Sequence, residues 1–137
     1  MFTSFQSRWN RLRNHQGSTE QDILRTIEAI TKRVQAGVEC IYAILDREDH
    51  CYTQLAAEED GYHVEWREWG ESFVHWWAKG IDEDEWITQA EAIRIFLAFL
   101  HKQSKPSGFY WFNMNSQLEQ SEPPDGESRN LNRDWRP

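Results

Sequence analysis

The sequence predicts a single α+β domain over residues 17–115, with an N-terminal helix, an antiparallel four-strand meander, a buried apolar helix and a short final strand. Two segments repeat apolar residues at three- and four-residue steps, which is typical of helices. Four segments of strand-forming residues lie between them, separated by turns rich in Asp, Glu and Gly. The chain of 137 residues also has the usual length of one domain.

The first helix is predicted between Ser18 and Gly37. Ser18 and Gln21 have the spacing of a capping box at its start, and Gly37 is a residue type that commonly ends helices. Its apolar stripe consists of Ile23, Ile27, Ile30 and Val34. We therefore expect one face of this helix to pack against the core.

A meander of four strands is predicted next, over residues 38–45, 50–56, 62–67 and 72–77. The first of these strands is largely apolar, which is typical of a buried strand. In the third strand Tyr62, Val64 and Trp66 alternate with polar residues, which is typical of a half-exposed strand. The turns are expected at residues 46–49, at residues 58–61 and at Gly70.

The second helix is predicted to begin at Thr88, which has the spacing of a capping box with Glu91. Apolar residues between positions 92 and 100 cover most of its circumference, so we expect it to be the buried helix of the domain. Residues 109–112 then form the short final strand.

Two terminal segments fall outside the predicted domain. Residues 1–16 form a basic arm in which Phe2, Phe5, Trp9 and Leu12 have helical spacing, so we expect a short amphipathic helix. Residues 116–137 are polar and contain the turn-forming run Pro123-Pro124-Asp125-Gly126, so we expect a mobile tail.

The two cysteines, Cys40 and Cys51, are predicted on neighbouring strands of one hairpin, whose turn is centred near residues 47–48. In that register Cys51 lies opposite Ile44, and the two thiols are about 13 Å apart at the rise of a strand. This distance is too long for a disulfide, so we expect reduced, buried thiols, which fit a cytoplasmic protein.

The net charge of −8 is concentrated in the middle of the chain. Residues 17–91 carry 18 acids and 6 bases, whereas residues 1–16 carry three bases and no acid. An acidic surface repels nucleic acids and anionic lipids, so we expect neither a direct nucleic-acid partner nor a membrane partner. The sequence also shows no secretory signal and no apolar run of about 20 residues, which favours a cytoplasmic location.

The motifs of common enzyme classes are missing from the sequence. It contains no glycine-rich phosphate loop, no nucleophile elbow and no zinc-binding spacing, so we expect no catalytic residue, metal or cofactor. Exposed acids are also poor general acids, because that role needs a carboxyl of raised pKa. An enzyme with a diffuse site stays open as an alternative, because His63 and His75 fall on adjacent predicted strands and could approach one another.

Tryptophans and acids gather in one region and form the candidate contact surface. Because neighbouring residues of a strand point to opposite faces, Trp76 and Trp77 cannot both face one core. One of them is therefore exposed or covered by another element such as the N-terminal segment. Exposed tryptophan beside clustered acids is typical of an interface that attracts a basic partner. The predicted partner-binding residues are Trp69, Trp76, Trp77, Asp82, Glu83, Asp84, Glu85 and Trp86.

The order of elements over residues 18–114 resembles the first-numbered immunity-protein family of bacterial polymorphic toxin systems. The residues that carry the resemblance are the run from Trp86 to Leu100, then Pro106 and Phe109-Tyr110-Trp111. In that family, too, a helix rich in Ala and Phe-Leu leads through a proline to a strand with a tryptophan. The resemblance implies a small cytoplasmic protein that binds a cognate toxin domain and blocks its active site, and it transfers no functional residue.

We therefore expect an immunity-type inhibitor that neutralises a basic, nuclease- or deaminase-like toxin. The first alternative is an acidic mimic of DNA that inhibits a nucleic-acid enzyme of phage or plasmid origin. The second alternative is the enzyme with a diffuse site of histidines and carboxylates. A free sheet edge near the final strand would also permit a homodimer.

Overall fold

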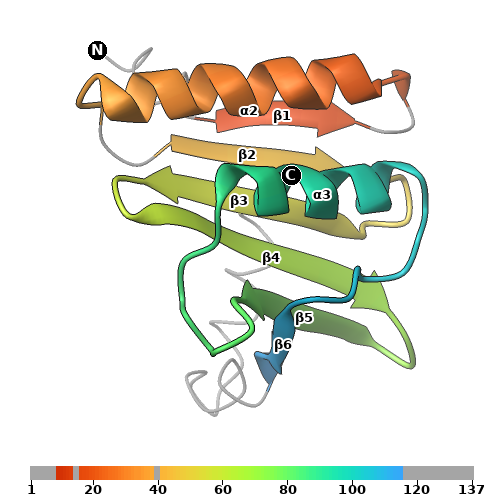
Figure 1. Cartoon of the computed structure of the whole chain (residues 1–137). Coiled ribbons are helices and arrows are strands. Elements are labelled where there is room, and N and C mark those ends of the chain that lie inside the picture. The colour runs from red at the N-terminus through yellow and green to blue at the C-terminus, as the bar shows by residue number, and fades with distance from the viewer. Residues whose placement is uncertain (1–8, 14–15, 39–40, 116–137) are drawn as a thin grey trace, which may run out of the picture.

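Within the described residues, two helices pack on one face of a six-stranded sheet (Figure 1). The structure is a computed structural model and describes residues 9–13, 16–38 and 41–115. The strands are β1 (Trp9–Arg13), β2 (Ile41–Asp46), β3 (Tyr52–Glu58), β4 (Gly61–Trp69), β5 (Phe73–Lys79) and β6 (Tyr110–Asn113). The helices are α2 (Glu20–Gln35) and α3 (Gln89–Leu100).

The strands follow one another across the sheet in chain order. β1 and β2 pair in parallel, with α2 as the crossover between them, and all later neighbours pair antiparallel. The predicted α+β class is confirmed. The sheet differs from the predicted four-strand antiparallel meander, because it has six strands and one parallel pair. β6 is an edge strand, and a homodimer formed through it stays a prediction.

The N-terminal arm differs from its prediction, because residues 9–13 form a strand and not part of an amphipathic helix. β1 covers a hydrogen-bonding edge of β2 that would otherwise stay unpaired. Leu12 packs against the core, and the Asn10 side chain donates to the Tyr42 carbonyl at 3.1 Å. The remaining arm residues, 1–8 and 14–15, and the predicted tail 116–137 lie outside the described residues.

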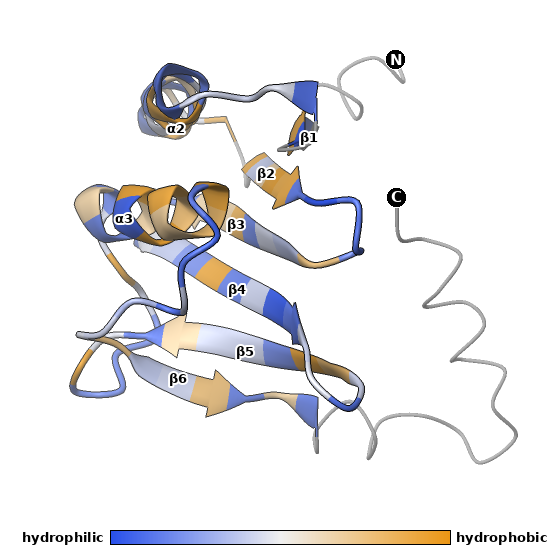
Figure 2. Ribbon diagram, turned by 90° about the vertical axis from the view of Figure 1, so that its right-hand side faces the viewer, coloured by the Kyte–Doolittle hydropathy of each residue, from blue (hydrophilic) through white to orange (hydrophobic). Residues whose placement is uncertain are grey.

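The core lies between the helices and the inner face of the sheet. Both helices lie on the same side of the sheet, as Figure 2 shows. Three residues of the predicted stripe of α2, Ile23, Ile27 and Ile30, are at most 1% exposed, and the fourth, Val34, is half-buried against the core. α3 is also buried on most sides, as predicted; its buried residues are Ala92, Ile95, Phe96, Ala98, Phe99 and Leu100. The amphipathic helix α2 and the apolar helix α3 therefore cover one face of the sheet.

Both helices begin with a capping box, and one box differs from the prediction by one residue. α3 begins at its predicted box. α2 is capped by Thr19 with Asp22, whereas the prediction used Ser18 with Gln21. The Ser18 hydroxyl instead accepts a hydrogen bond from the Arg13 N–H at 3.1 Å, which ties the end of β1 to the start of α2.

The β2–β3 hairpin turns later in the chain than predicted. Ile44 pairs with Gln54 and not with Cys51. The Asp49 carboxylate fixes this turn, because it accepts a hydrogen bond from the Cys51 N–H at 3.0 Å. Cys51 is buried, and burial raises the pKa of its thiol. Cys40 lies outside the described residues, so the spacing of the two thiols stays a prediction.

The Glu68 carboxylate joins β4 and β5 to the segment after α3. It accepts hydrogen bonds from the indole N–H groups of Trp66 and Trp76, each at 3.0 Å, and from the Lys105 ammonium at 2.8 Å. Burial raises the pKa of Glu68, but Lys105 and the two indoles together lower it by more. Its pKa therefore lies below the ordinary value of 4.5.

Replacing Glu68→Gln should lower the free energy of unfolding by about 1–2 kcal/mol at pH 7, because two indoles and an ammonium lose a charged acceptor. The folded-state pKa is depressed, so this stabilisation is complete above pH 4.5 and is lost as the pH falls through the folded-state value. Urea unfolding at a series of pH values measures both effects. The two proteins should converge in stability in acid.

The matched control for this prediction is Glu71→Gln, at an exposed position in the turn between β4 and β5. It should change the free energy of unfolding by less than about 0.5 kcal/mol. If both variants lose the same stability at pH 7, Glu68 does not have the role assigned to it.

Candidate functional site

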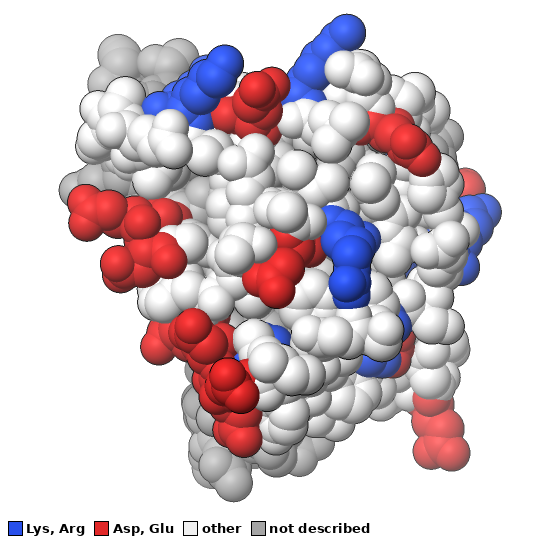
Figure 3. Space-filling model, in the orientation of Figure 1, with Lys and Arg blue, Asp and Glu red and all other residues white. Residues whose placement is uncertain are grey.

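Two acidic turns lie side by side at one end of the sheet. The last residue of β3 and the β3–β4 turn carry Glu58, Glu59 and Asp60, and the loop from β5 to α3 carries Asp82-Glu83-Asp84-Glu85. All seven side chains are exposed. We name residues 58–60 and 82–85 the acidic end. Figure 3 shows acidic side chains along the left margin of the molecule, where Figure 1 places this turn and this loop.

Backbone contacts hold the two turns together. The Tyr62 N–H donates to the Ile87 carbonyl at 2.9 Å, and the Ile87 N–H donates to the Tyr62 carbonyl at 3.0 Å. A Cβ atom at Gly61 would lie 2.9 Å from the Ile87 carbonyl oxygen and 3.2 Å from the Trp86 Cβ. Gly61 also has a φ of +139°, which other residues rarely adopt. The close approach of the two turns therefore requires glycine.

The loop before α3 has a fixed backbone of its own. The Gly80 N–H donates to the Asp84 carbonyl at 2.8 Å, and the Glu83 N–H donates to the Gly80 carbonyl at 2.7 Å. The Asp84 carboxylate accepts from the Trp86 N–H at 3.3 Å. Ile81 lies within this loop and is 72% exposed. The loop thus presents one large apolar side chain beside four acids.

The acidic end is not neutralised by any described cation. Among the described residues, no lysine, arginine or histidine forms an ion pair with the seven acids. Lys79, at the end of β5, is close in sequence, but its ammonium lies over the rings of Trp77 and Phe112 at 4.4 and 4.8 Å. Clustered carboxylates give this end of the molecule a negative potential, which attracts cationic groups.

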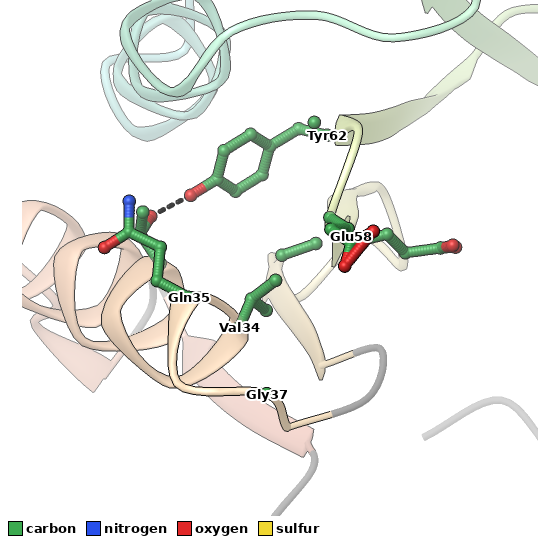
Figure 4. Close-up of a pocket in the computed structure, with 9 residues that line it drawn as sticks. Val34, Gln35, Gly37, Glu58 and Tyr62 are labelled. Atoms are coloured by element: carbon green, nitrogen blue, oxygen red, sulfur yellow. Dashed lines mark hydrogen bonds between the residues drawn. The ribbon is translucent and has the colours of Figure 1, made fainter.

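A small cavity opens beside the acidic end, between the end of α2 and the β3–β4 turn (Figure 4). Its volume is about 250 Å³. The wall formed by α2 includes Thr31, Val34 and Gln35, and the opposite wall includes Ala57, Glu58 and Tyr62. The cavity and the acidic end therefore share the β3–β4 turn.

The predicted tryptophans do not all lie beside the acidic loop. Trp86 does, and it is half-buried. Trp69 is 62% exposed, but it lies at the other end of β4, where its ring contacts Phe73. At the rise of a strand, the nine residues of β4 separate Trp69 from the acidic end by roughly 25 Å. The structure therefore keeps these two parts of the predicted surface apart.

Trp76 and Trp77 point to opposite faces of the sheet, as the alternation predicts. Trp76 pairs across the strands with buried Trp66 and packs against the core, with the Lys105 ammonium 4.4 Å from its ring centroid. Trp77 lies on the outer face and stacks on His63, with ring centroids 4.5 Å apart. Both are half-buried, and neither lies in the acidic loop.

The histidines of the enzyme alternative are not brought together. In the β4–β5 register the position opposite His63 lies four residues beyond His75, which separates them by about 13 Å. The expectation that they approach one another is therefore wrong. His63 instead lies 3.5 Å from Glu65, whose pKa is raised by burial although His63 and Gln54 lower it in part. Within the described ranges, no group of three or more His, Cys, Asp or Glu could hold a metal ion.

Sequence reasoning missed the acids of the β3–β4 turn and Ile81 as parts of the candidate site. A signal for the acids was present, because successive strands of an antiparallel meander reverse direction. The turn after β3 and the loop after β5 must therefore lie at the same end of the sheet. For Ile81 the sequence holds no comparable signal, since an isoleucine in a loop can be either exposed or buried.

Comparison with known proteins identifies no family for this chain. No family model matches it, and neither do the curated proteins or the solved structures. The resemblance to immunity proteins therefore stays a prediction from the sequence. In the part of the chain that the structure describes, no helix is long and apolar enough to cross a membrane.

Replacing Gly61→Ala should lower the free energy of unfolding by about 2 kcal/mol, because a side chain is strained at this φ and meets the Ile87 carbonyl. The amides of Tyr62 and Ile87 should also exchange their hydrogens faster, since the contact between the turns loosens. Denaturant unfolding and amide hydrogen exchange measure the two effects.

Gly70→Ala is the matched control, because the nearest heavy atom to an added Cβ there is the Ser72 carbonyl oxygen at 3.7 Å. It should change the free energy of unfolding by less than about 0.5 kcal/mol. Equal stability of the two variants would show that the contact at Gly61 does not constrain the turns.

Proposed function

We propose that the protein is an immunity-type inhibitor that binds a basic, nuclease- or deaminase-like toxin domain through its acidic end. The observation that carries the proposal is the convergence of seven exposed carboxylates on two joined turns. Such a surface speeds association with a basic protein and disfavours acidic partners. In this proposal the chain acts in the cytoplasm, by binding and not as an enzyme, and needs no cofactor.

The local structure of the acidic end supports a binding role. Its backbone is held by the hydrogen bonds of Gly80, Tyr62 and Ile87, so little conformational entropy is lost when a partner binds. Exposed Ile81 and half-buried Trp86 add apolar contact area beside the charges. Protein interfaces combine apolar contacts with a polar rim, and the acidic end offers groups of both kinds.

The proposed interface keeps only some of the contact residues that the sequence predicts. Asp82–Glu85 and Trp86 belong to it, together with the β3–β4 turn and Ile81. Trp69, Trp76 and Trp77 are left out, because they lie at the far end of β4, against the core and on the outer face of the sheet.

A DNA mimic is the alternative, and the distribution of charge argues against it. The phosphates of one DNA strand follow a long helical path and rise about 3.4 Å per nucleotide along the helix axis. The seven acids of this protein instead gather on two turns at one end of the sheet. That arrangement suits a compact basic patch on a protein better than a long DNA groove.

The first test identifies the partner. Tagged protein captures proteins from a lysate of the native organism, with washes at low and then moderate salt, and mass spectrometry identifies them. The expected result is one stoichiometric basic protein with a toxin-like domain, whose activity the chain inhibits. A DNA-handling enzyme that releases the chain when DNA is added would favour the alternative. Capture of no basic protein, even with toxin expression induced, would contradict both.

Neutralising three acids of the loop should slow association with that partner about tenfold at low ionic strength, because electrostatic steering is reduced. The triple variant is Asp82→Asn, Glu83→Gln and Glu85→Gln. Asp84 is kept, because its carboxylate accepts from the Trp86 N–H. Stopped-flow association rates measure the effect, and the difference from the unmodified chain should shrink as salt is added.

The matched control changes the net charge equally at exposed positions outside the acidic end, with Glu28→Gln, Glu48→Gln and Glu71→Gln. It should slow association by less than about twofold, because steering depends on where the charges lie. Equal slowing by the two triple variants would remove the acidic end from the interface.

A further inference from the structure

Two hydroxyl groups from opposite walls of the cavity form a hydrogen bond whose direction can be assigned. The Thr31 hydroxyl donates to the Ile27 carbonyl at 2.8 Å. Its single hydrogen is then used, so it must accept in its hydrogen bond with the Tyr62 hydroxyl (Figure 4). Tyr62 is thus the donor, and its oxygen keeps a lone pair for a further donor. Burial raises the pKa of Tyr62, so it stays protonated at neutral pH.

The other polar groups around the cavity also favour a ligand that donates hydrogen bonds. Glu58 and Glu59 line it from the β3–β4 turn and are exposed at the surface. α2 ends at Gln35 beside the cavity, where the helix has its partially negative end. Lys32 and Arg33 lie in that last turn and offset part of this effect, but they do not line the cavity.

The size of the cavity limits what can enter it. Pockets for small-molecule ligands usually measure about 300–1,000 Å³, and this one measures about 250 Å³. Val34, Ala57 and the ring of Tyr62 give it apolar walls. A long side chain with an apolar stem and a charged end matches both the size and this combination of walls.

We infer that the cavity binds one cationic side chain, a lysine or an arginine, of the basic partner. The stem packs against Val34 and Ala57, the charged end donates to the Tyr62 oxygen, and the exposed carboxylates of Glu58 and Glu59 attract its positive charge. The inference rests on the proposed function for the identity of the partner. The binding of a free cationic probe to the cavity does not depend on the proposed function, so the cavity and the proposed function can be tested separately.

The probes are Nα-acetyl-arginine amide and Nα-acetyl-lysine amide, titrated into the full chain and followed by the backbone amide NMR spectrum. We expect saturable binding with a Kd on the order of 1 mM for at least one of them. The shifted amides should be those around the cavity, such as Gly37, Ala57 and Gly61. Nα-acetyl-norleucine amide is the matched neutral probe, because it has an apolar stem without the charge, and it should give no saturable shift.

Two variants test the assigned groups with the same probes. Tyr62→Phe keeps the ring and removes the acceptor, and should weaken binding about tenfold. The double variant Glu58→Gln and Glu59→Gln should weaken it about fivefold. Because both glutamates are exposed, this variant keeps the fold even if Tyr62→Phe lowers stability.

The matched double control is Glu48→Gln with Glu71→Gln, two exposed acids in other turns, which should weaken binding less than twofold. Equal binding of the neutral probe, or shifts spread over the acidic loop without saturation, would overturn the assignment of the cavity. If partner association still depends on residues 82–85 in that case, the proposed function stands without this site. Saturable shifts at the cavity, together with partner association that is unchanged when residues 82, 83 and 85 are neutralised, would support the site and contradict the proposed function through the acidic end.

Discussion

Two backbone hydrogen bonds between Tyr62 and Ile87 connect the parts of the molecule on which the proposed function depends. They hold the residue before the capping box of α3 against the start of β4, so the helix enters the core at a fixed position. The same contact brings the loop before α3 beside the β3–β4 turn. From this point the Tyr62 ring extends to Thr31 on α2 and forms part of the cavity wall. The core helix, the acidic end and the cavity therefore share one contact, which only glycine at position 61 permits.

Elements that depend on residues close in sequence could be predicted, and those that depend on distant partners could not. The stripe of α2 and the capping box of α3 are local patterns, and both are present in the structure. Trp9 and Leu12 of β1 have helical spacing, yet this segment forms a strand because β2 offers a free edge. The β2–β3 register likewise depends on the Asp49 side chain in the turn, which the spacing of apolar residues does not reveal.

The charged residues of the candidate site could be predicted from the sequence, because charge keeps a side chain exposed. The exposure of its aromatic residues could not, because it depends on packing. Carboxylates stay in water unless they are paired, so the acidic loop could be expected at the surface. An aromatic side chain is exposed or buried according to what packs on it: Trp66 is 3% exposed, whereas Trp69 is 62% exposed. Alternation separated Trp76 from Trp77 but could not show that Lys105 and Glu68 cover Trp76. Tryptophan content alone therefore overestimates the contact surface.

The acidic end is unfavourable for the isolated chain, and this bears on its role. Two like charges in water repel each other by about 1 kcal/mol at 4 Å, and by less in salt. Some acids in other parts of the fold are paired with cations, as Glu68 is with Lys105 and Asp46 is with Arg11. Paired acids contribute little to the field, whereas the seven clustered acids of the acidic end add their negative potentials to one another. A basic partner would be attracted by this potential, and its positive charges would also relieve the repulsion among the acids. The relief of that repulsion would make the binding free energy more favourable.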